Sequence, residues 1–117
     1  MTSLGRHLLI DYHGCDRELI TDTAFVRKVL LEAATRAGAT IVTDVFHTFN
    51  PHGVSGVVVI AESHLAVHRH AAVLGPGVDV FSCGTKMRPE VIEAFLKDVF
   101  RAKTSFVREL ERGSAPC

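Results

Sequence analysis

The chain has 117 residues and no formal net charge, because 13 lysines and arginines balance 13 aspartates and glutamates. Hydrophobic residues make up 47% of it, enough for one small domain with its own core. With neither an excess of basic residues nor an apolar run of membrane-spanning length, we expect no nucleic-acid partner and no membrane partner.

The cysteines favour a reducing compartment. Cys15, Cys83 and Cys117 are an odd number and contain no CxxC pair, so neither a disulfide framework nor a zinc ribbon is expected. The first 16 residues lack the apolar core and cleavage site of a signal peptide. We therefore expect a cytoplasmic protein.

The first elements are a strand and a helix. Residues 7–12 alternate between the two faces of a strand, and residues 21–37 carry apolar side chains at helical spacing. Thr21 or Asp22 can cap the start of this helix, and Gly38 can end it.

The middle of the chain predicts a hairpin. Residues 40–49 form a second strand, and residues 55–61 return as a third strand after a turn at residues 50–53. Residues 64–73 fit either a continued strand or a loop.

The last elements are a fourth strand at residues 78–83 and a second helix. Pro89 fits the first turn of that helix, and its apolar face reaches Phe100, with a possible extension through Leu110. The order strand, helix, three strands, helix predicts an α+β fold. This is a two-layer α/β sandwich, with an antiparallel sheet and both helices packed on one face.

A serine follows the most apolar strand. The run from Val57 to Ala61 reads as an interior strand and ends in Glu62-Ser63. A hydroxyl at a strand end beside a base can attack a carbonyl, although most such serines only make local hydrogen bonds. His68 and Cys83 are candidate partners, but no GxSxG elbow is present.

Other polar and aromatic residues have two readings each. His64, His68 and His70 would share one face of a strand, but the fourth ligand of a zinc site is missing and we expect no metal. Cys83 can be a small buried residue. Phe49 can be a core residue or can stack on a planar ligand.

Three segments carry a resemblance to a known family. GRHLLIDYHGCD, FHTFNPHGVSGVVVIAESHLAVH and VDVFSCG resemble the prokaryotic S-adenosylmethionine decarboxylases, from about Gly5 to Leu96. The resemblance implies one domain over residues 1–117 that cuts itself between Glu62 and Ser63. Ser63 would become a covalent pyruvoyl group, which forms a Schiff base with the substrate amine and acts as electron sink.

The resemblance also assigns roles. It makes His68 the processing base, Ser55 a hydrogen-bonding partner of the cyclic intermediate, Cys83 the acid that protonates the product, and Phe49 one side of the adenine slot. It implies a self-processing decarboxylase of polyamine synthesis that acts on a small molecule, S-adenosylmethionine, as a homodimer of processed protomers with the active site near the dimer interface.

One segment departs from the family pattern. After the processing histidine the family usually continues Thr-Trp-Pro-Glu, whereas this chain has Arg69, His70, Ala71 and Ala72. By resemblance, the missing Trp stacks on adenine and the missing Glu binds the ribose. L-ornithine or L-arginine is therefore an alternative substrate for the same chemistry. A non-catalytic α/β binding module is a further alternative.

Overall fold

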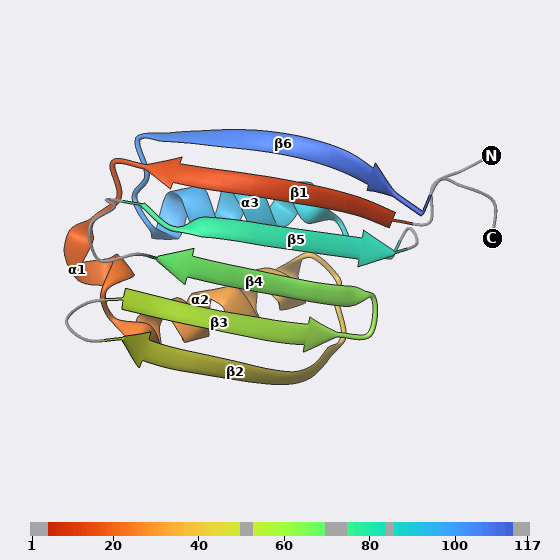
Figure 1. The fold of residues 1–117 in the computed structure, drawn as a ribbon, viewed down its shortest axis with the longest axis horizontal. Helices are drawn as coiled ribbons and strands as arrows, with labels where there is room; N and C mark the ends of the chain where they lie inside the picture. The colour runs from red at the N-terminus through yellow and green to blue at the C-terminus, as the bar shows by residue number, and fades with distance from the viewer. Residues whose placement is uncertain (1–4, 50–52, 70–74, 84–85, 114–117) are drawn as a thin grey trace.

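A computed structural model describes residues 5–49, 53–69, 75–83 and 86–113. The strands are β1 Gly5–His13, β2 Ile41–Phe49, β3 Gly53–Ile60, β4 Ser63–Arg69, β5 Gly77–Cys83 and β6 Thr104–Arg112. The helices are α1 Arg17–Ile20, α2 Thr23–Arg36 and α3 Pro89–Val99. The strands form one antiparallel sheet in the order β2-β3-β4-β5-β1-β6, with the helices on one face (Figure 1). The predicted two-layer sandwich is confirmed.

Helix α2 begins and ends close to its predicted limits. The Asp22 carboxylate accepts a hydrogen bond from the Phe25 N–H at 3.2 Å, so Asp22 rather than Thr21 is the cap. Gly38 follows the helix with a φ of +89°, a conformation that glycine adopts without steric cost. The residues before Asp22 form the separate one-turn helix α1.

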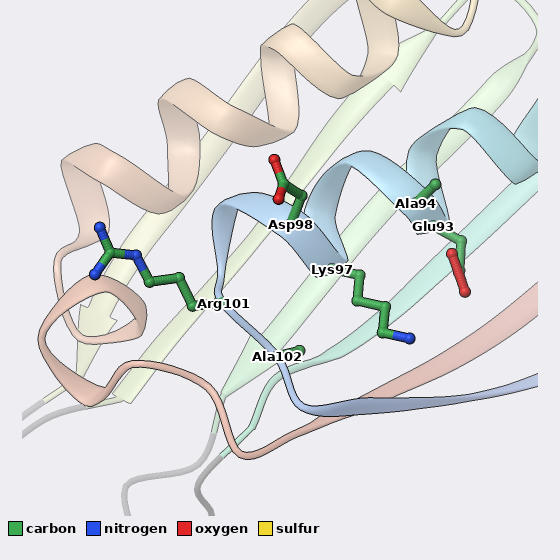
Figure 2. A pocket seen from close by; sticks show the side chains of 6 residues that line it. All are labelled: Glu93, Ala94, Lys97, Asp98, Arg101 and Ala102. Carbon is green, nitrogen blue, oxygen red and sulfur yellow. The ribbon is translucent and has the colours of Figure 1, made fainter.

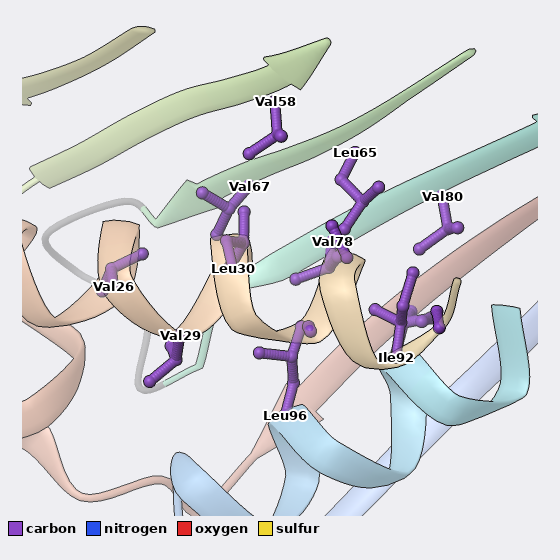
Figure 3. Close-up of a cluster of buried hydrophobic side chains, with 14 of the residues drawn as sticks. Val26, Val29, Leu30, Val58, Leu65, Val67, Val78, Val80, Ile92 and Leu96 are labelled. Carbon is purple, nitrogen blue, oxygen red and sulfur yellow. The ribbon is translucent and has the colours of Figure 1, made fainter. Parts of the chain in front are cut away.

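The hydrophobic core lies between the helices and the central strands (Figure 3). Leucine, isoleucine and valine side chains of α2 and α3 face those of β3, β4 and β5 in this layer. Full burial of one such side chain contributes about 1.5–3 kcal/mol. The labelled members of this core are Val26, Val29, Leu30, Val58, Leu65, Val67, Val78, Val80, Ile92 and Leu96.

The other face of the sheet, called here the open face, is covered by no described helix (Figure 1). Alternation along β4 buries Leu65 and Val67 under the helices and places His64 and His68 on the open face. Large hydrophobic residues remain exposed on this face, namely Val45, Phe49, Val59, Phe106 and Leu110.

The expected extension of the second helix through Leu110 is wrong. Helix α3 ends at Val99, and Arg101 then adopts a φ of +56°, which ends a right-handed helix. Residues 104–112 instead form β6, which pairs with β1 along its whole length. Phe106, Val107 and Leu110 fit helical spacing by coincidence, because β6 is an edge strand with side chains exposed on both faces.

The segment left open between strand and loop is a strand as far as Arg69. Strand β4 pairs with β3 on one side and β5 on the other, so it lies at the centre of the sheet. Residues 70–74 lie outside the described part of the chain. The observed sheet therefore has two strands, β4 and β6, beyond the four that the element order predicted.

Candidate active site

The Glu62-Ser63 bond lies at the exit of a tight hairpin. Strand β3 ends at Ile60, Ala61 and Glu62 form the turn, and Ile60 pairs with Ser63 at the start of β4. The Ala61 N–H donates to the Thr40 carbonyl at 2.8 Å, which ties the turn to the start of β2. The predicted serine therefore follows a buried strand, and it is also the first residue of the next one.

The carbonyl of Glu62 has a main-chain donor. Because Ser63 pairs with Ser82 on β5, the neighbouring Cys83 N–H points at the turn and donates to the Glu62 oxygen at 3.1 Å. This carbonyl is the one that a Ser63 nucleophile would attack. A donor already in place there polarises the bond and can stabilise negative charge on its oxygen.

The side chain of Glu62 is held on the opposite side of the turn. This side chain is only 8% exposed, and its carboxylate accepts from the Thr40 N–H at 3.0 Å and lies 3.6 Å from the Lys86 ammonium. Lys86 also donates to the Thr40 hydroxyl at 2.9 Å. The Thr40 N–H above all, then the N–H of Glu62 itself and the charge of Lys86, lower the pKa of Glu62, so this carboxyl stays ionised at neutral pH.

The Ser63 hydroxyl lies next to a histidine that sequence reasoning left undecided. Its oxygen is 3.3 Å from His64 Nδ1. The His64 ring packs edge-on to His7, with centroids 6.4 Å apart, and tilted against Phe81 at 5.8 Å. These three rings come from the neighbouring strands β1, β4 and β5 of the open face.

A second group of predicted residues lies at the other end of the sheet. Ser55 and His68 are direct partners in the β3–β4 register, and His47 of β2 pairs with Ser55 in the same row. The Phe49 ring is 47% exposed and packs against His47 at a centroid distance of 4.5 Å. The predicted Ser55, His68 and Phe49 are thus neighbours on the open face.

The two groups are far apart within one chain. Ser63 and His68 stand at opposite ends of β4, and five residues of strand span roughly 16–17 Å. The structure therefore brings Ser63 together with Glu62 and Cys83, but it does not bring His68 to Ser63. Sequence reasoning missed this separation because it left residues 64–73 unassigned, and it also missed the contacts of Thr40 and Lys86.

The two free thiols of the described chain have different environments. Cys15 is half-buried, and burial raises the pKa of its thiol to about 11. That thiol is therefore protonated at neutral pH, as a packing residue would be. Cys83 is exposed, at the end of β5 beside Glu62.

Two surface grooves among the described residues lie on the helix layer. One groove on α3 is lined by Glu93, Ala94, Lys97, Asp98, Arg101 and Ala102 (Figure 2). A second, next to it, extends to Arg36 of α2. Neither includes a predicted site residue. Among the described residues there is no cluster of three or more metal-ligating side chains, and no helix suited to crossing a membrane.

Comparisons with known proteins agree on one family. A family model described as S-adenosylmethionine decarboxylase matches residues 6–113. The S-adenosylmethionine decarboxylase proenzyme of Thermodesulfovibrio yellowstonii is 43% identical over 113 residues, which cover 97% of this chain and 84% of that protein. The proenzyme of the same name from Thermotoga maritima is 44% identical over 113 residues, 97% of this chain and 87% of that protein.

A solved structure supports the same assignment. The crystal structure of the adenosylmethionine decarboxylase from Aquifex aeolicus matches with a TM-score of 0.90 and 28% sequence identity, over 99% of this chain and 96% of that chain. Fold and comparisons together place the chain among the decarboxylases, a class of lyases. Within that class it belongs to the S-adenosylmethionine decarboxylase family, as the sequence resemblance predicted.

Proposed function

We propose that the chain is a proenzyme that cuts itself between Glu62 and Ser63 and then acts as a pyruvoyl-dependent S-adenosylmethionine decarboxylase of polyamine synthesis. The observation that carries this proposal is the 3.1 Å hydrogen bond from the Cys83 N–H to the Glu62 carbonyl, one bond from the Ser63 nucleophile. Curated relatives at 43–45% identity are named proenzymes of this activity. Free thiols at Cys15 and Cys83 agree with a cytoplasmic location.

The cleavage chemistry uses groups already in contact. The Ser63 oxygen bonds to the Glu62 carbonyl carbon and loses its proton, and the Cys83 N–H stabilises the oxyanion. The C–N bond then breaks, and the Ser63 nitrogen gains a proton, which leaves an ester. Removal of the Ser63 α-proton expels Glu62 as a carboxylate. Water then displaces the nitrogen of residue 63 as ammonia, and a pyruvoyl group remains.

The residues around position 63 fit such a group. It would occupy the start of β4, at the same end of the sheet as the exposed Cys83. Residue 63 alternates onto the same side of β4 as Leu65, and the adjacent His64 lies on the open face against Phe81. The pyruvoyl ketone supplies an electron sink for the bond that loses carbon dioxide. The exposed Cys83 thiol at the same end of the sheet supports the proposal that it returns a proton to the product.

We further propose that the site is completed by a second copy of the chain. His68 and Ser55 lie roughly 16–17 Å from Ser63 along β4, too far to act on it within one protomer. Two open faces packed about a two-fold axis would bring His68 of the partner subunit toward the end of β4 that carries Ser63, and the reverse. The exposed apolar residues Val45 and Val59 suit such a buried interface.

A second candidate function is favoured by the departures at residues 69–72. Arg69 is 2% exposed and lies on the helix side of β4, so it does not face His68 and Phe49 on the open face. It therefore does not replace the ribose-binding Glu of the family from that position. A basic amino acid such as L-ornithine or L-arginine needs no nucleoside contacts, and the same pyruvoyl chemistry would serve it.

Intact mass of the purified chain tests the proposal. We expect two products, residues 1–62 and residues 63–117 with a pyruvoyl end, and a single uncut chain for Ser63→Ala. Ser82→Ala, which removes the neighbouring hydroxyl across the β4–β5 register, is the matched control and should still be cut. A wild-type chain that stays whole with an ordinary serine at position 63 would favour the rival, a non-catalytic binding module.

A further inference from the structure

His64 is the ionisable side chain in contact with the Ser63 hydroxyl. Its Nδ1 lies 3.3 Å from the Ser63 oxygen, at the long end of hydrogen-bonding distance. Catalytic hydrogen bonds are often long before the reacting geometry forms. The two residues are adjacent in the sequence, so this contact needs no second chain and exists as soon as the hairpin folds.

The His64 ring is held in place by its neighbours. His7 packs edge-on to it and Phe81 is tilted against it, while His7 and Phe81 also contact each other at 5.6 Å. Arg112 lies 3.1 Å from His7 Nδ1 and over the Phe81 ring at 5.3 Å. A guanidinium can only donate, so His7 Nδ1 accepts and the proton of a neutral His7 sits on Nε2. The surrounding rings therefore limit the orientations open to His64.

Self-cleavage requires two separate proton removals. The first takes the proton of the Ser63 hydroxyl, and the second takes the proton of the Ser63 α-carbon. His68 of the same chain cannot make the first contact, because the strand places it roughly 16–17 Å away. His64 Nδ1 can do so directly.

We infer that His64 is the base of the first step, a group distinct from His68, the processing base that the family resemblance names. As the Ser63 oxygen bonds to the Glu62 carbon, its proton moves to His64 Nδ1 and the carbonyl oxygen becomes an oxyanion at the Cys83 N–H. When the C–N bond breaks, His64 returns that proton to the Ser63 nitrogen. The ester therefore forms with no net gain or loss of protons. This inference rests on the proposed self-cleavage.

The two steps are separable because an ester is cut by hydroxylamine, whereas a peptide bond is not. Each variant is refolded or freshly expressed, and its intact mass is then measured over time with and without hydroxylamine. We expect His68→Ala to accumulate an ester that hydroxylamine splits at position 63. We expect His64→Phe to remain a peptide that hydroxylamine leaves whole, with a first-step rate reduced about 10²- to 10⁴-fold.

Two further variants distinguish a base from a residue that only orients the hydroxyl. In His64→Asn the side-chain oxygen can accept from Ser63 but cannot take up its proton, so we expect the same loss. His64→Ala should regain cleavage when imidazole is added to the buffer, a rescue that a purely structural role would not give. His13→Phe, on the open face but away from Ser63, is the matched control and should be cut like wild type.

The outcomes separate this inference from the proposed function. Wild-type cleavage together with normal cleavage of His64→Asn overturns the role of His64 as a base. An ester that accumulates in His64→Phe also overturns it, because the first step would then have occurred. A wild-type chain that never forms ester or pyruvoyl overturns the self-cleavage itself. Circular dichroism of His64→Phe shows whether its sheet has formed.

Discussion

The main-chain N–H of Cys83 donates to the carbonyl oxygen of Glu62, at an N···O distance of 3.1 Å. These residues are far apart in the sequence and meet because β5 ends beside the β3–β4 turn. The contact uses the backbone of Cys83 and leaves its thiol free on the open face. One residue can thus serve cleavage through its main chain and turnover through its side chain.

The first prediction separates these two roles. Cys83→Ala keeps the N–H and removes the thiol, so we expect self-cleavage at close to the wild-type rate and a loss of steady-state turnover. Intact mass measures the first quantity and carbon dioxide release the second. Undiminished turnover in this variant would remove the thiol from the mechanism. Slow cleavage would instead mean that the thiol contributes to processing.

The second prediction concerns the contacts of the Glu62 carboxylate. Lys86→Met removes one of its two partners and leaves the Thr40 N–H in place. The Lys86 side chain is largely exposed, so we expect cleavage to slow only about two- to fivefold, the range of an exposed ion pair. The rate of appearance of residues 63–117 measures this. Lys103→Met is a control, since Lys103 lies at the opposite end of the sheet. Equal rates for all three chains would show that the turn needs no such contact.

The third prediction is a pH dependence of stability from the same carboxylate. The pKa of Glu62 is lowered in the folded chain, by the Thr40 N–H above all. Its contribution is therefore present above the ordinary carboxyl pKa and is lost as pH falls through the lowered value. In the uncut Ser63→Ala background, Glu62→Gln should lower Tm at pH 7 and make a smaller difference near pH 4. A difference that stays constant between these pH values would contradict this assignment.

The fourth prediction tests the composite site. Ser63→Ala retains His68, and His68→Ala retains Ser63, so a mixed dimer contains one complete pair of groups. We expect the His68→Ala chain to acquire a carbonyl end, detected with a hydrazide label, only when both variants are co-expressed. Labelling of His68→Ala expressed alone would show that the partner's His68 is not required.

The proposed dimer interface has its own test. Val45 is 64% exposed on the open face, and Val107 is 45% exposed on the helix side of edge strand β6. Val45→Asp should shift the chain toward monomer and slow cleavage, whereas Val107→Asp should do neither. Substitutions at such exposed positions change the folding free energy by only about 0.5 kcal/mol or less. A dimer that tolerates Val45→Asp would argue against packing through the open face.

The sequence was informative where periodicity and burial coincide. The apolar run ending at Ala61 predicts β3, and the cap at Asp22 and the glycine at position 38 predict the limits of α2 within two residues. Strand β6 was not predicted, because its edge position leaves Phe106 and Leu110 exposed and its apolar and polar residues do not alternate regularly. Propensity and spacing alone do not decide between a helix and a strand there.

The sequence predicts the residues of the candidate site but not the distances between them. Residue types and the family resemblance selected Ser63, His68 and Cys83, but their distances depend on β4 being a fully extended central strand. The contacts of Glu62 with Cys83, Thr40 and Lys86 join loops that are distant in the chain. Such contacts arise from strand order, which local patterns do not encode.

The last prediction concerns the substrate. The missing Trp and Glu of the family pattern fall at His70 and Ala72, which lie outside the described residues. Loss of a stacking aromatic side chain costs about 0.5–1.5 kcal/mol of binding free energy beyond the contribution of its buried surface. Loss of a hydrogen-bonded carboxylate costs about 1–3 kcal/mol. Together these reduce kcat/KM for a nucleoside substrate by roughly one to three powers of ten. Phe49, to which the resemblance assigns one side of the adenine slot, is exposed on the open face.

We therefore expect carbon dioxide release from S-adenosylmethionine with a low kcat/KM, and a gain of roughly ten- to a thousandfold in the double variant His70→Trp, Ala72→Glu. L-ornithine, L-arginine and L-lysine at equal concentration are the comparison substrates. Efficient release from L-ornithine or L-arginine, with S-adenosylmethionine inert in both chains, would establish the second candidate function. In that case the pyruvoyl group and the fold are shared with the family, and the reaction has moved to a basic amino acid because the nucleoside contacts are gone.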